Sequence, residues 1–279
     1  MKQRRNLVCA LALCVGALVG SMPVFCAEPA VVPTLRGRVE VAAATHASET
    51  KAHGKKVAEA GAGETIGGRA GSAKVRSGAI PATVVWLTAA PGSDVRLDAP
   101  APAEGASARL VQKNKSFQPH LLVIPAGSMV EFPNRDPFFH NVFSLFEGKR
   151  FDLGLYEAGT TRAVRFDRPG ISYVFCNIHP EMSAVVITMG TPLYAIAGKD
   201  GQVSIANVPY GRYALHIWSE GMGPENDQSL TRDITIGENS TSLGVIKVPE
   251  ADGQRIAHKN KYGREYDQPT PDNSIYQQR

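Results

Sequence analysis

Cysteine is scarce in this chain, which has 4 among 279 residues. Three of them, Cys9, Cys14 and Cys26, fall within the first 27 residues. Beyond that stretch Cys176 stands alone, so no disulfide can form within the remaining chain. In an oxidising compartment a solitary thiol is open to oxidation unless it is buried or bound to a metal. The scarcity of cysteine therefore excludes a scaffold held by disulfides and singles out Cys176.

The chain also lacks an apolar run long enough to cross a membrane as a helix. The run over residues 7–20 is shorter than the roughly 20 residues that a membrane span needs. Three basic residues precede it and small residues follow it up to Ala27, which is the layout of a secretory signal peptide. We therefore expect residues 1–27 to be a signal peptide. The mature chain is expected in the periplasm, without a membrane span.

A large excess of charge of either sign is lacking as well. The formal net charge is +4, and residues 1–27 carry three basic and no acidic side chains, so their removal lowers it to +1. A nearly neutral protein offers little electrostatic attraction to the phosphates of a nucleic acid. We therefore expect no nucleic-acid partner.

The most informative stretch that is present is CNIHPEM, residues 176–182, in which Cys176, His179 and Met182 are each three residues apart. Composition alone predicts about 0.002 occurrences of this spacing. Together with a second imidazole, these are the donors of a blue-copper site, in which two histidines and a cysteine form a plane and a methionine binds weakly. His140 in PFFHNVFS is the candidate for the second imidazole. The sequence thus predicts one type 1 copper ion bound by His140, Cys176, His179 and Met182, with no catalytic residues.

Closely spaced strand patterns with turns between them fill residues 107–190. Several short strands of this kind are typical of an all-β sandwich. The strands that we predict are ARLVQKN, HLLVIP, SMVEFPN, HNVFSLF, RAVRFD, ISYVFC and SAVVITM.

Residues 107–190 resemble a cupredoxin domain of the plastocyanin and amicyanin type. The resemblance rests on FQPHLLVIPAGSMVEFPNRD, HNV, FDLGLYEAGTT, FDRPGISYVFC and the CNIHPEM loop. It implies a Greek-key sandwich in which Cys176 ends one strand, His179 lies in the loop and Met182 begins the returning strand. It also implies that Asn141 helps to hydrogen-bond the region around the Cys176 sulfur.

A second strand pattern, PLYAIAGKDGQVSIANVPYGRYALHIW, follows in residues 191–249. Turn signals at Asp200-Gly201 and at Pro209-Tyr210-Gly211 separate its alternating runs. This pattern resembles a carboxypeptidase-regulatory-like β-sandwich. Two strands that this family normally places before the segment are matched by residues 34–41 and 82–87, which precede the cupredoxin stretch.

These resemblances suggest a nested organisation of two β-sandwiches. We expect the cupredoxin domain, residues 107–190, to be inserted into a discontinuous sandwich made of residues 28–106 and 191–249. A linear pair of domains, with the early strands joining the cupredoxin sheet, is the alternative. Residues 42–79 lose all apolar periodicity and are expected to form a flexible insertion. Residues 250–279 are expected to form a polar tail.

For residues outside the predicted copper site, the sequence gives weaker indications of a role. His120 is expected at the surface and His216 in packing, whereas His46 and His53 lie in the predicted insertion, as solvated side chains or weak metal ligands. Aromatic residues in the tail could dock it on the protein: these are Tyr262, Tyr266 and Tyr276. Phe138, Phe139 and Pro180 flank the two proposed imidazoles and either pack in the core or form an apolar rim for a redox partner.

The function that fits these features best is single-electron transfer by an exported copper protein without enzymatic activity. Its partners would be periplasmic redox proteins such as a c-type cytochrome or a dehydrogenase. Two alternatives remain open. One is a copper enzyme with an open coordination position, involving His120. The other is a binding, structural or adhesion module in which copper is accessory or stored.

Overall fold

The computed structural model describes residues 32–42, 79–98, 100–103, 105, 107–145, 148–220, 222, 230–250 and 258–266. The predicted signal peptide and residues 43–78 of the predicted insertion lie outside them. Every regular element in the described residues is a β-strand, which confirms the all-β prediction. The strands are β1 (Leu35–Val41), β2 (Thr83–Ala89), β3 (Ser107–Arg109), β4 (Val111–Gln112), β5 (Phe117–Gln118), β6 (Leu121–Pro125), β7 (Ser128–Pro133), β8 (His140–Ser144), β9 (Phe151–Tyr156), β10 (Thr161–Phe166), β11 (Gly170–Cys176), β12 (Ser183–Met189), β13 (Tyr194–Ile196), β14 (Gln202–Ile205), β15 (Gly211–Ser219), β16 (Arg232–Ile236) and β17 (Ser242–Val248).

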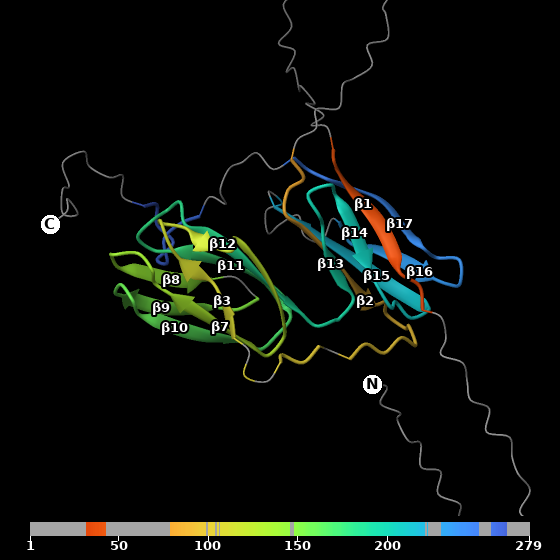
Figure 1. Cartoon of the computed structure of the whole chain (residues 1–279), viewed down its shortest axis with the longest axis horizontal. Coiled ribbons are helices and arrows are strands. Elements are labelled where there is room, and N and C mark those ends of the chain that lie inside the picture. The colour runs from red at the N-terminus through yellow and green to blue at the C-terminus, as the bar shows by residue number, and fades with distance from the viewer. Residues whose placement is uncertain are drawn as a thin grey trace, which may run out of the picture. The chain divides into compact units, whose positions relative to one another are not determined.

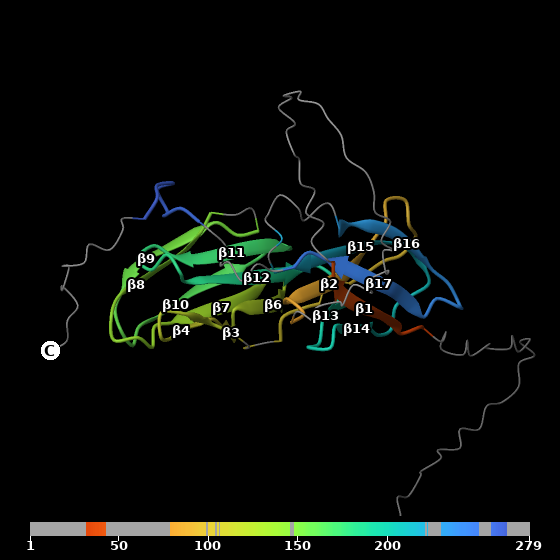
Figure 2. The ribbon, with the colours of Figure 1, turned by 90° about the horizontal axis from the view of Figure 1, so that it is seen from above.

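One sandwich is built from two sheets, with strand orders β6-β12-β11-β8-β9 and β10-β7-β3. Figure 2 shows β11 and β12 in one layer and β3 and β7 in the other. Alternation decides which side chains face the space between the layers. Along β11, Val174 and Cys176 belong to the cluster of buried residues inside this sandwich, whereas Tyr173 and Phe175 belong to a different cluster. The cysteine thiol is therefore part of the sandwich core.

Two details of this sandwich differ from the predicted strands. The first predicted strand is divided into β3 and β4, and between them the amide of Leu110 donates to the carbonyl of Glu131. In addition, FDLGLY forms β9, which our predicted strands did not include. Asp152 and Gly154, whose φ is +66°, interrupt the apolar alternation that identifies a strand. Pairing with β8 nevertheless keeps this segment extended.

A second sandwich has the strand orders β14-β1-β17 and β13-β2-β15-β16. Strand β1 pairs with β14 and β17, and β2 pairs with β13 and β15. Figure 1 shows β1 beside β17, although all of the other sandwich lies between them in the sequence. Strands from before and after residues 107–190 therefore share sheets.

The apolar run of β2 has a simple structural explanation. Val85 and Leu87 pack in the core of the second sandwich, and Val84 and Trp86 point to the opposite face. A strand that is buried on both faces needs consecutive apolar residues, and alternation is lost. The outer faces of β2 and β15 meet the outer face of the sheet that contains β11 and β12. The buried residues of this shared layer are Val84, Phe143, Tyr173, Phe175, Val185, Ile187, Met189 and Trp218.

Two polar contacts accompany this shared apolar layer. The indole Nε1–H of Trp218 donates to the hydroxyl of Tyr173 over 3.2 Å. His120 Nε2 lies 2.9 Å from a carboxylate oxygen of Glu220, which directly follows β15. The indole of Trp218 is buried and requires a partner, so its bond to Tyr173 restricts how the two outer faces can pack. None of the described segments forms a helix with the length and apolarity that crossing a membrane requires.

Candidate metal centre

Two neighbouring strands position the predicted ligands. His140 is the first residue of β8, and Cys176 is the last residue of β11. The two strands are hydrogen-bonded in the same sheet, with Cys176 opposite Val142. His179 and Met182 lie in the short connection from β11 to β12. Ligands far apart in the sequence therefore lie near the ends of two neighbouring strands.

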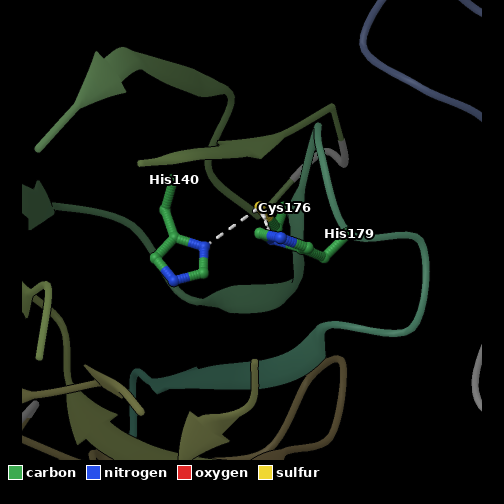
Figure 3. A group of neighbouring side chains, drawn as sticks. All are labelled: His140, Cys176 and His179. Carbon is green, nitrogen blue, oxygen red and sulfur yellow. Dashed lines mark hydrogen bonds between the residues drawn. The ribbon is translucent and has the colours of Figure 1, made fainter. Parts of the chain in front are cut away.

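The side chains of His140, Cys176 and His179 converge (Figure 3). The Cys176 sulfur is 3.5 Å from Nδ1 of His140 and 3.6 Å from Nδ1 of His179. The ligand atoms of the three residues all lie within 4.8 Å of one another. His140 and Cys176 are fully buried, and His179 is half-buried. Met182 is buried in the same core cluster as Cys176.

Backbone hydrogen bonds close the ligand loop, which we define as residues 176–182. The amide of Cys176 donates to the carbonyl of Met182 over 3.2 Å, and the amide of Met182 donates to the carbonyl of His179 over 3.0 Å. The amide of Asn177 donates to the carbonyl of Asn141 over 2.9 Å. The loop is thus tied to itself and to the residue that follows His140, which limits how far its donor atoms can separate.

A buried carboxylate orients the ring of His140. Asp136 Oδ2 lies 2.9 Å from Nε2 of His140, so Nε2 carries the proton and the lone pair of Nδ1 faces the sulfur. Asp136 also accepts the main-chain amides of Asn114 and Lys115, over 2.6 and 3.0 Å. Burial alone would raise the pKa of Asp136, but the hydrogen bonds from Lys115, His140 and Asn114 together hold it below its ordinary value. No role for Asp136 was predicted from the sequence. The one feature of the sequence that could have indicated it is the position of Asp136 four residues before His140.

Burial sets the protonation of the three donors. It lowers the pKa of His140, against the opposing effect of Asp136, and it lowers the pKa of His179. It raises the pKa of the Cys176 thiol, although amide hydrogen bonds from Asn141, Ile178 and His179 oppose the shift. Near neutral pH the free site therefore offers two uncharged imidazoles and a protonated thiol.

Asn141 braces the site mainly through its backbone. Its amide bonds to the Cys176 sulfur and its carbonyl accepts the amide of Asn177. Its side-chain amide instead donates to Asp152 Oδ1 on β9, over 2.6 Å. The resemblance implied a hydrogen bond near the sulfur, and the main chain of Asn141 makes it.

Aromatic residues surround the imidazoles on the more exposed side. The ring centroid of Phe138 lies 5.3 Å from that of His140 and 5.4 Å from that of His179. Phe138 is half-buried, Phe139 is 46% exposed and Pro180 is exposed. Phe138 therefore lies beside both imidazoles, whereas Phe139 and Pro180 are exposed.

The remaining predicted histidines take no part in this cluster. His120 contacts Glu220 and, through Nδ1, the carbonyl of Ser183. His216 stacks on Trp86 with 5.2 Å between ring centroids, as its expected packing role requires. His46 and His53 lie outside the described residues.

Part of the tail contacts the ligand loop, which sequence reasoning did not foresee. The hydroxyl of Tyr266 donates to the main-chain carbonyl of Cys176 over 2.9 Å. Tyr262 is 71% exposed, and Tyr276 lies outside the described residues. Among the three tyrosines proposed to dock the tail, Tyr266 contacts the ligand loop.

No protein-family model matches this chain, and no curated protein matches it. Solved structures match about a third of it. A copper-containing nitrite reductase from Thermus scotoductus SA-01 matches 34% of this chain at 25% identity, with a TM-score of 0.30, and this chain covers only 27% of that enzyme. A purple cupredoxin from Nitrosopumilus maritimus matches 30% of this chain and 100% of its own at 23% identity, with a TM-score of 0.27. Amicyanin from Paracoccus versutus matches 37% of this chain and 97% of its own at 22% identity, with a TM-score of 0.28.

Proposed function

We propose that this chain is an exported single-copper protein that carries single electrons between redox partners in the periplasm. The observation that carries the proposal is the convergence of His140 Nδ1 and His179 Nδ1 on the Cys176 sulfur, at 3.5 and 3.6 Å. Met182, buried in the same core, would be the weak axial ligand. The ion would be one type 1 copper.

The donor set fits copper better than magnesium or calcium. Thiolate and thioether are soft ligands that favour Cu(I), and imidazole binds both copper oxidation states. Magnesium and calcium prefer oxygen ligands, which none of the four proposed residues offers. A copper ion bound here would supply a one-electron Cu(II)/Cu(I) couple.

The protein's contribution is to hold the donors in place and to exclude water. His140 and Cys176 are anchored on hydrogen-bonded strands and are fully buried. The ligand loop is closed by its own backbone hydrogen bonds. Donors that are held by packing and hydrogen bonds keep one geometry in both oxidation states, so little rearrangement accompanies the transfer of an electron.

The partner would dock at the apolar rim of Phe138, Phe139 and Pro180 beside His179. Electron-transfer encounters use small, weak interfaces, because a carrier must release its partner. We propose a periplasmic c-type cytochrome or dehydrogenase as this partner.

Electron transfer is favoured over catalysis by the position of His120. In the enzyme alternative, this residue would complete or open the copper coordination. Its two ring nitrogens instead contact Glu220 and Ser183. We therefore propose a carrier without catalytic residues.

We also propose that the second sandwich is a carboxypeptidase-regulatory-like module into which the copper domain, residues 107–190, is inserted. The pairing of β1 with β14 and β17, and of β2 with β13 and β15, supports this proposal. A linear arrangement would instead place β1 and β2 in the sheets of the copper domain.

The test is the optical and paramagnetic-resonance spectrum of the full chain purified with copper. One copper per chain and an intense sulfur-to-copper absorption band are expected. Cys176→Ser should abolish this band, whereas His216→Gln, which alters a histidine outside the cluster, should leave it unchanged. A colourless copper complex of the unaltered chain, or a band that persists in Cys176→Ser, would overturn the proposal.

A further inference from the structure

Residues 258–266, which we call the clasp, lie on the ligand loop. Three contacts join them. The Tyr266 hydroxyl donates to the carbonyl of Cys176 (2.9 Å), the amide of Lys261 donates to Oδ1 of Asn177 (2.9 Å), and Nε2–H of His258 donates to the carbonyl of Pro180 (3.0 Å). Two of these contacts are to main-chain carbonyls, one of Cys176 itself and one of the residue after His179. The clasp therefore holds the loop at Cys176 and at the residue next to His179.

The peptide group between Cys176 and Asn177 is fixed from two directions. Its carbonyl accepts the hydrogen bond of Tyr266, and its amide donates to the carbonyl of Asn141 over 2.9 Å. A peptide group is planar, so two bonds on opposite sides prevent it from rotating. This peptide group begins the ligand loop, and its orientation sets the direction in which the chain leaves Cys176.

The clasp is itself a folded turn built around Asn260. Its side-chain oxygen accepts the amides of Tyr262 and Arg264, each over 3.0 Å. Its main chain exchanges bonds with Gly263 and Arg264, each over 2.8 Å, and Gly263 has a φ of +74°, which favours glycine. Because its shape is fixed locally, the clasp can present His258, Lys261 and Tyr266 together.

The clasp is also linked, through Asp152, to the residue that follows His140. Lys261 Nζ lies 2.8 Å from Oδ2 of Asp152, whose other oxygen accepts the side chain of Asn141 over 2.6 Å. Asn141 directly follows His140. The ring of His258 stacks on Phe175, the residue before Cys176, with 3.8 Å between centroids and an angle of 21°. The clasp thus contacts the neighbour of Cys176 directly and is linked to the neighbour of His140 through Asp152.

We propose that the clasp, with Tyr266 as its central residue, is a positioning element of the metal centre. It holds the ligand loop in its metal-binding geometry before the metal arrives and slows the loss of metal afterwards. Ordering that is completed in advance reduces the free-energy cost of binding, which is the basis of preorganisation. The inference rests on the proposed copper site, but it makes a separate claim about the loop in the metal-free protein.

Tyr266→Phe in the full chain tests the proposal, because it removes one hydroxyl and keeps the ring. Tyr210→Phe is the control, since Tyr210 is 41% exposed and lies outside both the clasp and the ligand loop. In the metal-free protein, amide hydrogen exchange of Cys176, Asn177 and Met182 should become several-fold faster in Tyr266→Phe, up to about tenfold for the loss of one hydrogen bond. Tyr210→Phe should match the unaltered chain.

Copper-loaded protein supplies the second measurement. Transfer of copper to an excess of chelator should be several-fold faster in Tyr266→Phe, and its paramagnetic-resonance line shape should change, while the melting temperature stays within about 4 °C. Exchange in residues 176–182 and copper release that both equal those of the unaltered chain would overturn the proposal. Failure of the unaltered chain to form a blue site would instead overturn the proposed function, and the exchange experiment would still decide the role of the clasp.

Discussion

Asp136 Oδ2 lies 2.9 Å from Nε2 of His140, and both side chains are buried. The carboxylate fixes the proton on Nε2 and so turns Nδ1 towards Cys176. It is in turn held by the main-chain amides of Asn114 and Lys115. The direction of one proposed ligand thus depends on a loop that begins more than twenty residues earlier in the chain.

Replacing Asp136 tests this dependence. Asp136→Asn keeps the size of the side chain and removes its charge, so His140 becomes a weaker donor. We expect copper affinity to fall about 10- to 100-fold and the reduction potential to rise, because Cu(II) depends more on a strongly donating imidazole. Equilibrium dialysis and voltammetry check both expectations. Asp167→Asn removes an exposed carboxylate that pairs with Lys149 and should change neither quantity.

Met182→Leu tests the proposed axial ligand. The swap conserves volume approximately, so stability should fall by less than about 1.5 kcal/mol. Copper should remain bound, and the reduction potential should rise by on the order of 60 mV, which corresponds to a tenfold shift toward Cu(I). Voltammetry of the loaded variant makes the measurement. An unchanged potential would argue against axial binding by Met182.

Metal binding should release one proton near neutral pH. Burial lowers the pKa of both His140 and His179 below their ordinary value and raises the pKa of Cys176 above its own. Between about pH 7 and 8.5 only the thiol must lose a proton, so the logarithm of the binding constant should rise by about one per pH unit. The measurement is titration calorimetry with Zn²⁺, which cannot oxidise the thiol. The difference between the binding enthalpies in two buffers gives the number of protons released. Zinc binding to Cys176→Ser should release no proton. A binding constant of the unaltered chain that does not change between about pH 7 and 8.5 would contradict the raised pKa of the thiol.

The contact between His120 and Glu220 should make stability depend on pH. The hydrogen bond that His120 donates to Glu220 is the main cause that raises the pKa of His120, and the same bond lowers the pKa of Glu220. When the pKa of a histidine is higher in the folded state than in the unfolded state, protonation of that histidine stabilises the folded state. This stabilisation is complete below the unfolded-state pKa of about 6.5, and it is lost as the pH rises through the folded-state pKa. Both groups are charged between about pH 5 and 6.5.

His120→Gln measures this contribution. Urea unfolding should show a loss of stability at pH 5.5 that shrinks by pH 8.5, and the loss should be below about 1 kcal/mol because both side chains are more than a third exposed. The partly exposed His216, changed to Gln, provides a comparison without a carboxylate partner. A loss for His120→Gln that is the same at both pH values would exclude an ionic contribution.

Local features of the sequence determined the fold class and the proposed donors. Alternation with turn residues between short runs predicted an all-β protein, and this is confirmed because alternation reflects burial of one face. Cys176, His179 and Met182 lie within seven residues, so a short loop keeps them close. The strand β9 escaped prediction because Asp152 and Gly154 break its alternation, and pairing with β8 overrides that local preference.

By itself, then, the sequence determined which chemical groups are available and which of them a short loop holds near one another. Only the tertiary structure decided which distant groups support them. Asp136 is near His140 in sequence, but its role depends on the fold of the loop that carries Asn114 and Lys115. Tyr266 bonds to a carbonyl 90 residues away, and such a bond has no sequence pattern. Its partner is a main-chain group that every residue carries, so the folded backbone alone selects which carbonyl it meets.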